Sequence, residues 1–461
     1  MTEPSRRALP PVRLVLDAPE MADASARFGR AEALRAVRAA LDEARERLVL
    51  DPTVDVTPHR LARRAFERLE GERPALRRVL NASGILLHTG LGRAPLAAEA
   101  IEAVVAVARG YCNLEIDLDS GERGHRSGPV ADLLIKLTGA AAAAVVNNNA
   151  AATVLALRAL AGGREAIVSR GQLIEIGGSF RLPEICAVSG AKLVEVGTTN
   201  RTRLADYERA IGPETAVLLR VHPSNYRVVG FTESVGIVEL ATLARSRGLR
   251  VIDDVGSGAL GPGLPPLVVG EPTVAEGLAA GADLVLASGD KLLGGPQCGL
   301  IVGRRDAVAL VEADPLARAF RVDKMTLAAL EATLKLVLGS RRVPLWTFLT
   351  TPVGDLLRRA ETLAAALRDN PGLAASAVPM SAYLGGGSLP GSELASAGLQ
   401  VSPPSGTSEG PWARLLRLGD PPIITRVHAG AVWFDLRAVE PGDDATLLIA
   451  IRRSIGEDAD R

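Results

Sequence analysis

The alternation of helical and β-type patterns between residues 76 and 345 limits the possible folds more than any other feature of this chain. Apolar residues at three- and four-residue spacing predict helices, and short runs rich in Val, Ile and Leu predict buried strands. The predicted helices are Leu96–Ala108, Val130–Thr138, Ala151–Ala161 and Val235–Arg247, and the predicted strands are Ala144–Val146, Ala166–Ser169, Leu193–Val196, Ala216–Val221, Leu249–Ile252, Leu284–Ala287 and Gly299–Gly303. This alternation predicts a three-layer α/β domain with a mostly parallel sheet.

The segments on either side of this domain show other patterns. Residues 1–75 predict a helical module, with one amphipathic helix around Leu34–Leu48 and a second that begins at Thr57 and Pro58. Residues 346–461 predict a small α+β domain that contains the strands Ile423–Val427 and Ala431–Leu436. Because 461 residues exceed what one hydrophobic core usually holds, we expect three domains, 1–75, 76–345 and 346–461.

Composition excludes several classes of protein. The formal net charge is zero, so affinity for nucleic acid must come from local patches; the first 80 residues contain 16 Arg and 13 acidic residues. The three cysteines form no CxxC pair and the five histidines are scattered, so we expect no metal site. No apolar run is long enough for a membrane span, and no segment resembles a signal peptide. We therefore expect a cytoplasmic enzyme.

Lys291 is the most informative single residue. The chain has only five lysines against 48 arginines, yet Lys291 follows a buried run, Leu284–Ala287, and precedes two glycines and a proline. A sheltered lysine can form a Schiff base with an aldehyde, which arginine cannot do. A lone lysine after a strand is more often a solvated loop residue, so this interpretation needs further support.

Two other segments supply that support, because pyridoxal 5′-phosphate (PLP) needs an acid at its ring nitrogen and a cradle for its phosphate. Asp253 and Asp254 end a predicted strand; either could be the acid, and we prefer Asp253. Asn147, Asn148 and Asn149 precede a helix whose N-terminus can bind an anion. Together with Lys291, these segments predict a PLP site.

Further motifs resemble one known family. They are Asn81–Leu96, Asn113–Asp117, Gly121–Arg126, Val146–Ala152, Ile176–Arg181, Gly197–Arg201, Ser224–Arg227, Ser288–Gln297 and Arg321–Lys324. Over essentially its whole length, the chain resembles the bacterial selenocysteine synthases, which are L-seryl-tRNA(Sec) selenium transferases. The resemblance implies the aminotransferase-like fold (fold type I) with PLP on Lys291. It also implies conversion of seryl-tRNA(Sec) to selenocysteinyl-tRNA(Sec), by loss of water through an aminoacrylyl-tRNA intermediate and addition of selenium from selenophosphate.

The same resemblance implies roles for particular residues. Lys291 would act as the base, and Asp290 would order neighbouring arginines or tune Lys291. The residues expected to bind substrate anions are Arg93, Arg126, Thr198, Thr199, Arg318 and Arg321. The helical module would grip the tRNA. The protein would form a homo-oligomer, at least a dimer, and the family implies a decamer.

The chain departs from the family at two places. Pro129–Ala131 replaces a run that contains His and Glu in many members, and Pro223 stands where Thr or Arg is common. Two alternatives remain open. The first is a PLP-dependent lyase or transferase that acts on a free amino acid; the second is a non-catalytic tRNA-binding protein on a PLP fold.

Overall fold

The structure, a computed structural model, describes residues 9–50, 54–70, 76–176, 180–261, 268, 270–368 and 373–455. Residues 1–8, 51–53 and 71–75 of the predicted helical module therefore lie outside the described residues. No helix among the described residues is long and apolar enough to cross a bilayer.

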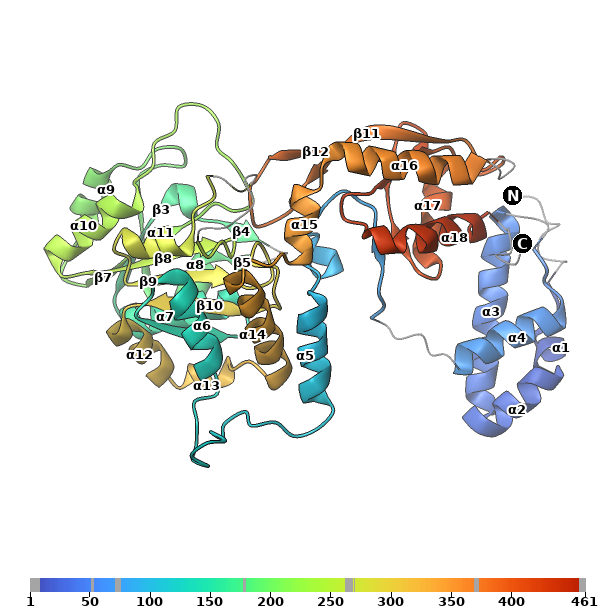
Figure 1. Cartoon of the computed structure of the whole chain (residues 1–461), viewed down its shortest axis with the longest axis horizontal. Helices are drawn as coiled ribbons and strands as arrows, with labels where there is room; N and C mark the ends of the chain where they lie inside the picture. The colour runs from blue at the N-terminus through green and yellow to red at the C-terminus, as the bar shows by residue number, and fades with distance from the viewer. Residues whose placement is uncertain are drawn as a thin grey trace.

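A seven-stranded sheet forms the centre of the largest unit, at the left of Figure 1. Its strands are β2 (Ala142–Val146), β3 (Glu165–Ser169), β6 (Lys192–Val196), β7 (Thr215–Val221), β8 (Arg250–Gly256), β9 (Leu284–Ser288) and β10 (Gly299–Gly303). Their order is β2-β10-β9-β8-β7-β3-β6, and only β10 runs antiparallel to its neighbours. The predicted mostly parallel sheet is thus confirmed.

Helices cover both faces of this sheet. One face packs against α7 (Asn149–Ala161), α8 (Leu182–Ser189) and α12 (Arg305–Ala313). The other face packs against α6 (Gly128–Thr138), α9 (Leu204–Ala210), α10 (Ile237–Arg247), α11 (Val274–Ala279) and α14 (Lys324–Leu338). Neighbouring residues of one strand enter different cores, Val251 the second and Ile252 the first. Burial on both faces explains why these strands are continuous apolar runs.

Four N-terminal helices form a separate bundle, drawn in blue in Figure 1. They are α1 (Val12–Leu16), α2 (Pro19–Phe28), α3 (Arg30–Leu50) and α4 (Pro58–Glu70). Helix α4 begins at Pro58, as the Thr57-Pro58 pair predicted. Val15, Met21, Val37 and Leu61 are fully buried in a core of their own. Arg414 Nη2 donates to Glu46 Oε2 at 3.0 Å, which links the bundle to the C-terminal region.

The C-terminal region contains a four-stranded antiparallel sheet, β11 (Ala375–Tyr383), β12 (Glu393–Val401), β15 (Ala431–Asp435) and β14 (Arg426–His428), in that order. Helices α16 (Val353–Arg368), α17 (Glu409–Leu418) and α18 (Asp444–Arg453) pack on it. The single strand predicted at Ile423–Val427 is divided at Thr425. Its first part, β13 (Ile423–Ile424), pairs with β1 (Leu80–Asn81), whereas β14 pairs with β15. Apolar alternation does not reveal which partner a strand will take.

The structure also contains shorter or separate elements outside these sheets and bundles. They include α5 (Ala98–Ala108), α13 (Leu316–Ala319), α15 (Pro344–Thr350) and the short strands β4 (Glu175–Ile176) and β5 (Phe180–Arg181). Leu80 and Ala82 lie in the core of the C-terminal sheet, although they fall inside the segment 76–345 that we expected to form the catalytic domain. After the N-terminal bundle, the chain therefore passes through the core of the C-terminal unit before it reaches the large sheet.

Candidate active site

Lys291 lies in the turn between β9 and β10, at the carboxyl end of the parallel strands. The residue is only 5 % exposed. Gly289 allows this turn to close, because a Cβ at that position would overlap Cys298 Sγ. A buried lysine in a closed turn is held in one place, which distinguishes it from the solvated loop lysine that a single-residue pattern would predict.

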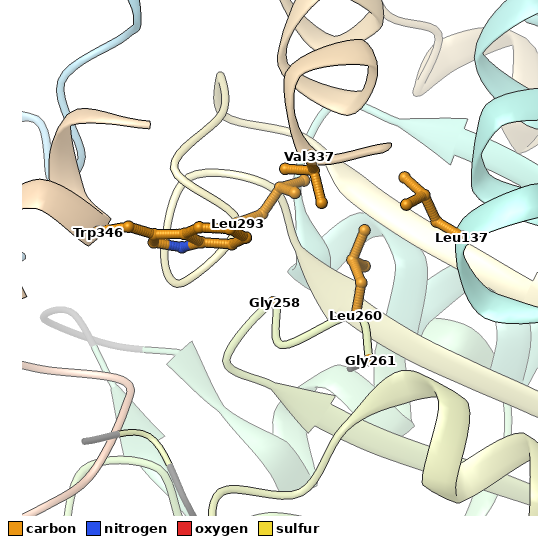
Figure 2. Close-up of a pocket in the computed structure, with 7 residues that line it drawn as sticks. All are labelled: Leu137, Gly258, Leu260, Gly261, Leu293, Val337 and Trp346. Atoms are coloured by element: carbon orange, nitrogen blue, oxygen red, sulfur yellow. The ribbon is translucent and has the colours of Figure 1, made fainter. Parts of the chain in front are cut away.

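A small apolar cavity lies next to this turn. It is lined by Leu137, Gly258, Leu260, Gly261, Leu293, Val337 and Trp346. Figure 2 shows Trp346 and Leu293 on one side and Leu137 on the other. Trp346 Nε1 donates to the Leu292 carbonyl at 2.7 Å, so the residue after Lys291 is tied to α15. The lining carries no charged side chain, which makes this cavity a packing feature and not a substrate site.

The surroundings of Lys291 favour its neutral, nucleophilic form. Burial lowers the pKa of Lys291, and the positive charge of Arg93 lowers it further. The carboxyl groups of Asp254, Asp290 and Glu271 act in the opposite direction but do not cancel the effect. A lysine with a lowered pKa loses its proton more easily, as an amine that attacks an aldehyde must do.

The two adjacent acids of β8 point to different layers. Asp254 accepts hydrogen bonds from Asn149 Nδ2 and Thr153 Oγ1, both at 2.9 Å and both from α7. If Gly256 carried a Cβ, this atom would lie 3.7 Å from Asp254 Oδ1 and 3.9 Å from Lys291 Nζ. Burial raises the pKa of Asp254. The carboxyl group of Asp254 and the amine of Lys291 therefore lie close together beside Gly256.

Asp253 lies among different groups. Its Oδ1 is 3.5 Å from Arg220 Nε, and neither of its oxygens has a hydrogen bond in the described part of the chain. Burial raises the pKa of Asp253 to about 6, although Arg220 opposes this shift. The geometry thus favours Asp254 as the partner of a bound ring nitrogen, against our preference for Asp253 from the sequence.

The three asparagines lie at the start of α7, beside Asp254. Asn148 caps the helix by accepting a hydrogen bond from the Ala151 amide at 2.8 Å. The Asn147 amide donates to the Phe320 carbonyl at 3.0 Å, which brings the segment before Arg321 next to this turn. The N-terminus of a 13-residue helix carries partial positive charge and suits a phosphate group.

The arginines expected near the cofactor fall into two groups. Arg93 Nη1 donates to Asp290 Oδ2 at 2.6 Å, beside Lys291. Arg126 Nε donates to Glu115 Oε1 at 2.9 Å, and Arg321 Nη1 lies 3.6 Å from the same oxygen. Arg318 belongs to α13, which leads into the segment of Arg321. Arg126 lowers the pKa of Glu115, so this carboxylate stays charged and holds both arginines.

Thr198 and Thr199 are not brought to Lys291 within one chain. They follow β6, which is the edge strand, and four strand spacings of about 4.8 Å separate β6 from β9, the strand before Lys291. Thr198 Oγ1 donates to the Arg201 carbonyl at 3.0 Å. Thr198 also borders a hollow lined by Arg170, Arg201, Arg203 and Arg209.

Sequence reasoning missed two contributors to the Lys291 site. Glu271 is 5 % exposed, and its Oε1 atom lies 3.7 Å from His222 Nδ1. Gly387 belongs to the loop between β11 and β12 and lies against the end of the Lys291 side chain. The Gly385–Gly387 run was visible in the sequence, but nothing local linked it to Lys291.

The departure at Pro129–Ala131 has a structural explanation. Pro129 lies in the first turn of α6, where proline is well tolerated, and Val130 is buried in the core. This segment is therefore a helix start. Among the residues that the structure describes, no three His, Cys, Asp or Glu side chains are grouped as a metal site would need.

Comparison with known proteins extends these observations. A family model described as L-seryl-tRNA selenium transferase matches residues 79–440, and one described as Selenocysteine synthase N terminal matches residues 6–45. A curated L-seryl-tRNA(Sec) selenium transferase from Moorella thermoacetica is 47% identical over 456 residues, which is 97% of each chain. One from Nitratidesulfovibrio vulgaris is 47% identical over 390 residues, which is 83% of each chain.

A solved structure of D-glucosaminate-6-phosphate ammonia-lyase has the same fold. It superposes with a TM-score of 0.60 at 22% identity and covers 84% of this chain and 97% of that chain. The likeness, together with the three-layer architecture, confirms the predicted aminotransferase-like α/β class.

Proposed function

Because this chain belongs to the L-seryl-tRNA selenium transferase family, we propose that it converts L-seryl-tRNA(Sec) to L-selenocysteinyl-tRNA(Sec) with PLP as its cofactor. The observation that carries the proposal is the buried Lys291, which lies beside Asp254 at the N-terminus of α7. These groups match what PLP requires: an amine, an acid for the ring nitrogen and a phosphate cradle. When bound, the cofactor supplies an electron sink for the carbon acid chemistry of the seryl group.

The residues around Lys291 would share the remaining work. Lys291 Nζ would hold the cofactor, and its neutral amine would be the base for the proton on the seryl Cα. Asp254 keeps the ring nitrogen protonated, and Asn149 and Thr153 hold its carboxylate in place. Asn147, Asn148 and the amides at the start of α7 that the Asn148 cap leaves free would bind the phosphate. Burial excludes water from the amine and preserves its reactivity.

The arginines would receive the selenium donor, selenophosphate, whose phosphate oxygens match the fork of a guanidinium group. Arg93 is close enough to Lys291 for its charge to lower the pKa of the amine, and Asp290 would order Arg93 through their hydrogen bond. The segment that carries Arg318 and Arg321 lies beside the α7 turn, because the Asn147 amide donates to the Phe320 carbonyl, and Arg126 shares Glu115 with Arg321. Thr198 and Thr199 would reach this anion only from a second copy of the chain, because their own strand is at the sheet edge.

The proposal includes the assembly and the location. The N-terminal bundle would bind the tRNA, and the protein would act in the cytoplasm as a homo-oligomer, at least a dimer and by family a decamer. The domain limits 1–75, 76–345 and 346–461 remain part of this proposal.

A single-turnover assay with seryl-tRNA(Sec) and selenophosphate tests the function. Selenium should appear on the tRNA, and Lys291→Ala should abolish both this product and the absorbance band of lysine-bound cofactor. Lys335→Ala is the matched control, because Lys335 pairs with Glu331 on the surface of α14.

Free serine and seryl-tRNA(Ser) serve as alternative substrates in the same assay. Turnover of free serine without a selenium-bearing tRNA would favour an enzyme of free amino acids. Binding of tRNA without cofactor or turnover would favour a non-catalytic tRNA-binding protein.

A further inference from the structure

A loop of the C-terminal region touches the reactive lysine. The loop, residues 384–392, joins β11 to β12. Gly387 has a φ of +104°, and a Cβ at this position would lie 2.7 Å from both Cε and Nζ of Lys291. Only a glycine permits this backbone to come so close to the amine, because any side chain would occupy the same space.

This loop is held at two points, Leu384 and Leu389. The Leu87 amide donates to the Leu384 carbonyl at 2.7 Å, on the side where the loop begins. On the other side, the Leu389 amide donates to Glu271 Oε2 at 3.4 Å. Glu271 belongs to the large unit and is buried, so it joins a residue of the C-terminal loop to the wall of the Lys291 site. The loop is therefore anchored between two units of the molecule.

The second oxygen of Glu271 faces the same site. Glu271 Oε1 lies 3.7 Å from His222 Nδ1, and both atoms are buried without a hydrogen bond within the described residues. His222 is fixed in turn, because its amide donates to the Asp254 carbonyl at 2.9 Å. A chain of contacts thus runs from Asp254 through His222 and Glu271 to the loop.

We propose that residues 384–392 form a positioning loop, through which the C-terminal region confines the Lys291 amine, with Gly387 as the contact and Glu271 as the anchor. The inference rests on the proposed function, because only an amine that must bind a cofactor and then move a proton needs such confinement. Lysine has four rotatable side-chain bonds, so a wall of backbone on one side removes many positions that the amine could otherwise take.

Gly387→Ala tests the contact. The added methyl group meets the flexible end of Lys291 and should displace the amine; the φ of +104° also adds backbone strain, which the thermal unfolding of the variant records. Attachment of PLP should then slow by between about 10- and 100-fold, the range expected for misplacing a reacting group by about 1 Å. Gly391→Ala is the control, because Gly391 also has a positive φ of +73° in this loop but nothing within 4 Å of its Cβ position.

Two substitutions at Glu271 test the anchor independently. Glu271→Ala removes the acceptor of the Leu389 amide and should slow PLP attachment, as Gly387→Ala does. Glu271→Gln removes the same negative charge but keeps an acceptor oxygen for the Leu389 amide, so it should attach PLP no more slowly than the unchanged protein. If Gly387→Ala does not fold, the comparison of Glu271→Ala with Glu271→Gln still tests whether the loop positions the amine.

The measurement is the growth of the lysine-bound absorbance band after PLP is added to protein stripped of cofactor, with thermal unfolding recorded for each variant. Failure of the unchanged protein to develop the band would refute the proposed function itself. Normal band growth in the unchanged protein, Gly387→Ala and Glu271→Ala alike would refute only the positioning loop. Slow growth in Gly387→Ala and Glu271→Ala, with normal growth in Gly391→Ala and Glu271→Gln, would support it.

Discussion

At the scale of single residues, the environment of each buried acid determines which role it can take. Asp254 and Asp253 are neighbours in sequence, but only Asp254 is hydrogen-bonded to α7 and close to the Lys291 amine. Asp253 is instead paired with Arg220, on the other face of the sheet. Identical side chains one residue apart therefore contact different groups, because a strand turns them to opposite layers.

Exchanging each acid for its amide separates these roles. Asp254→Asn should lower turnover of seryl-tRNA(Sec) by about 100-fold or more, the usual effect of losing a group that holds a catalytic proton. Asp253→Asn should leave turnover close to normal. Single-turnover rates of the two variants measure this difference, and a larger loss in Asp253→Asn would restore our preference from the sequence.

The lowered pKa of His222 predicts that the stability of the protein depends on pH. Burial, with the positive charges of Arg220 and Lys291, lowers the pKa of His222 from 6.5 to about 4. Between these values the unfolded chain binds a proton that the folded protein does not. The free energy of unfolding should therefore fall as the pH falls through this range, by up to about 1.4 kcal/mol per pH unit from this residue.

Replacing the ring should remove that contribution. His222→Gln should show a shallower loss of stability between pH 6.5 and 4.5 than the unchanged protein, measured by urea unfolding without cofactor. His428→Gln, at an exposed position, should show the same slope as the unchanged protein. Equal slopes in all three proteins would contradict the prediction.

At the scale of elements, the start of α7 combines a structural task with a binding task. Asn148 stabilises the helix by accepting a hydrogen bond from the Ala151 amide, and Asn149 donates to Asp254. The close approach of β10 requires Gly299, because a Cβ there would overlap the Asn148 carbonyl. The turn is thus fixed by the sheet before any ligand binds, which reduces the entropy lost on binding.

Asn148→Ala should therefore have two effects. Loss of the cap should lower the free energy of unfolding by about 1 kcal/mol. The affinity for PLP should fall as well, because the cradle loses its fixed shape. Glu239→Ala is the control: it removes a hydrogen bond of 2.9 Å to the Gly236 amide at the start of α10, on the opposite face of the sheet. Fluorescence titration with PLP should show unchanged affinity in this control, and equal losses in both variants would contradict a specific role of Asn148.

At the scale of the whole molecule, the N-terminal bundle and the Lys291 site depend on different hydrophobic cores. The N-terminal bundle has its own buried core, whereas the Lys291 site combines residues from the large sheet and from the C-terminal loop. We therefore expect the bundle to be removable without loss of the cofactor site, although the C-terminal region should not be.

Deleting residues 1–70 tests this division. The shortened protein should bind PLP and show the lysine-bound absorbance band, but it should fail to convert seryl-tRNA(Sec), because the proposed grip on the tRNA is lost. Absorbance and single-turnover assays measure the two properties. Full activity of the shortened protein on seryl-tRNA(Sec) would refute the assigned role of the bundle.

The sequence alone determined the class of fold and the elements of the large sheet, and it singled out Lys291 as the candidate lysine for the cofactor. These features depend on local patterns: apolar runs of strand length, helical periodicity and the rarity of lysine beside a glycine-rich turn. The strand Gly299–Gly303 was predicted with its observed limits. The relationship to the family was also readable from motifs, since each motif is a contiguous segment.

Only the tertiary structure decided which distant residues meet. It favoured Asp254 over Asp253, brought Glu271 and Gly387 to Lys291, divided the strand at Thr425 and left Thr198 at the sheet edge. Each of these facts depends on contacts between segments far apart in sequence, and local patterns carry no record of such contacts. Register and packing between layers are set when the whole chain buries its apolar surface at once, so they emerge only from the folded molecule.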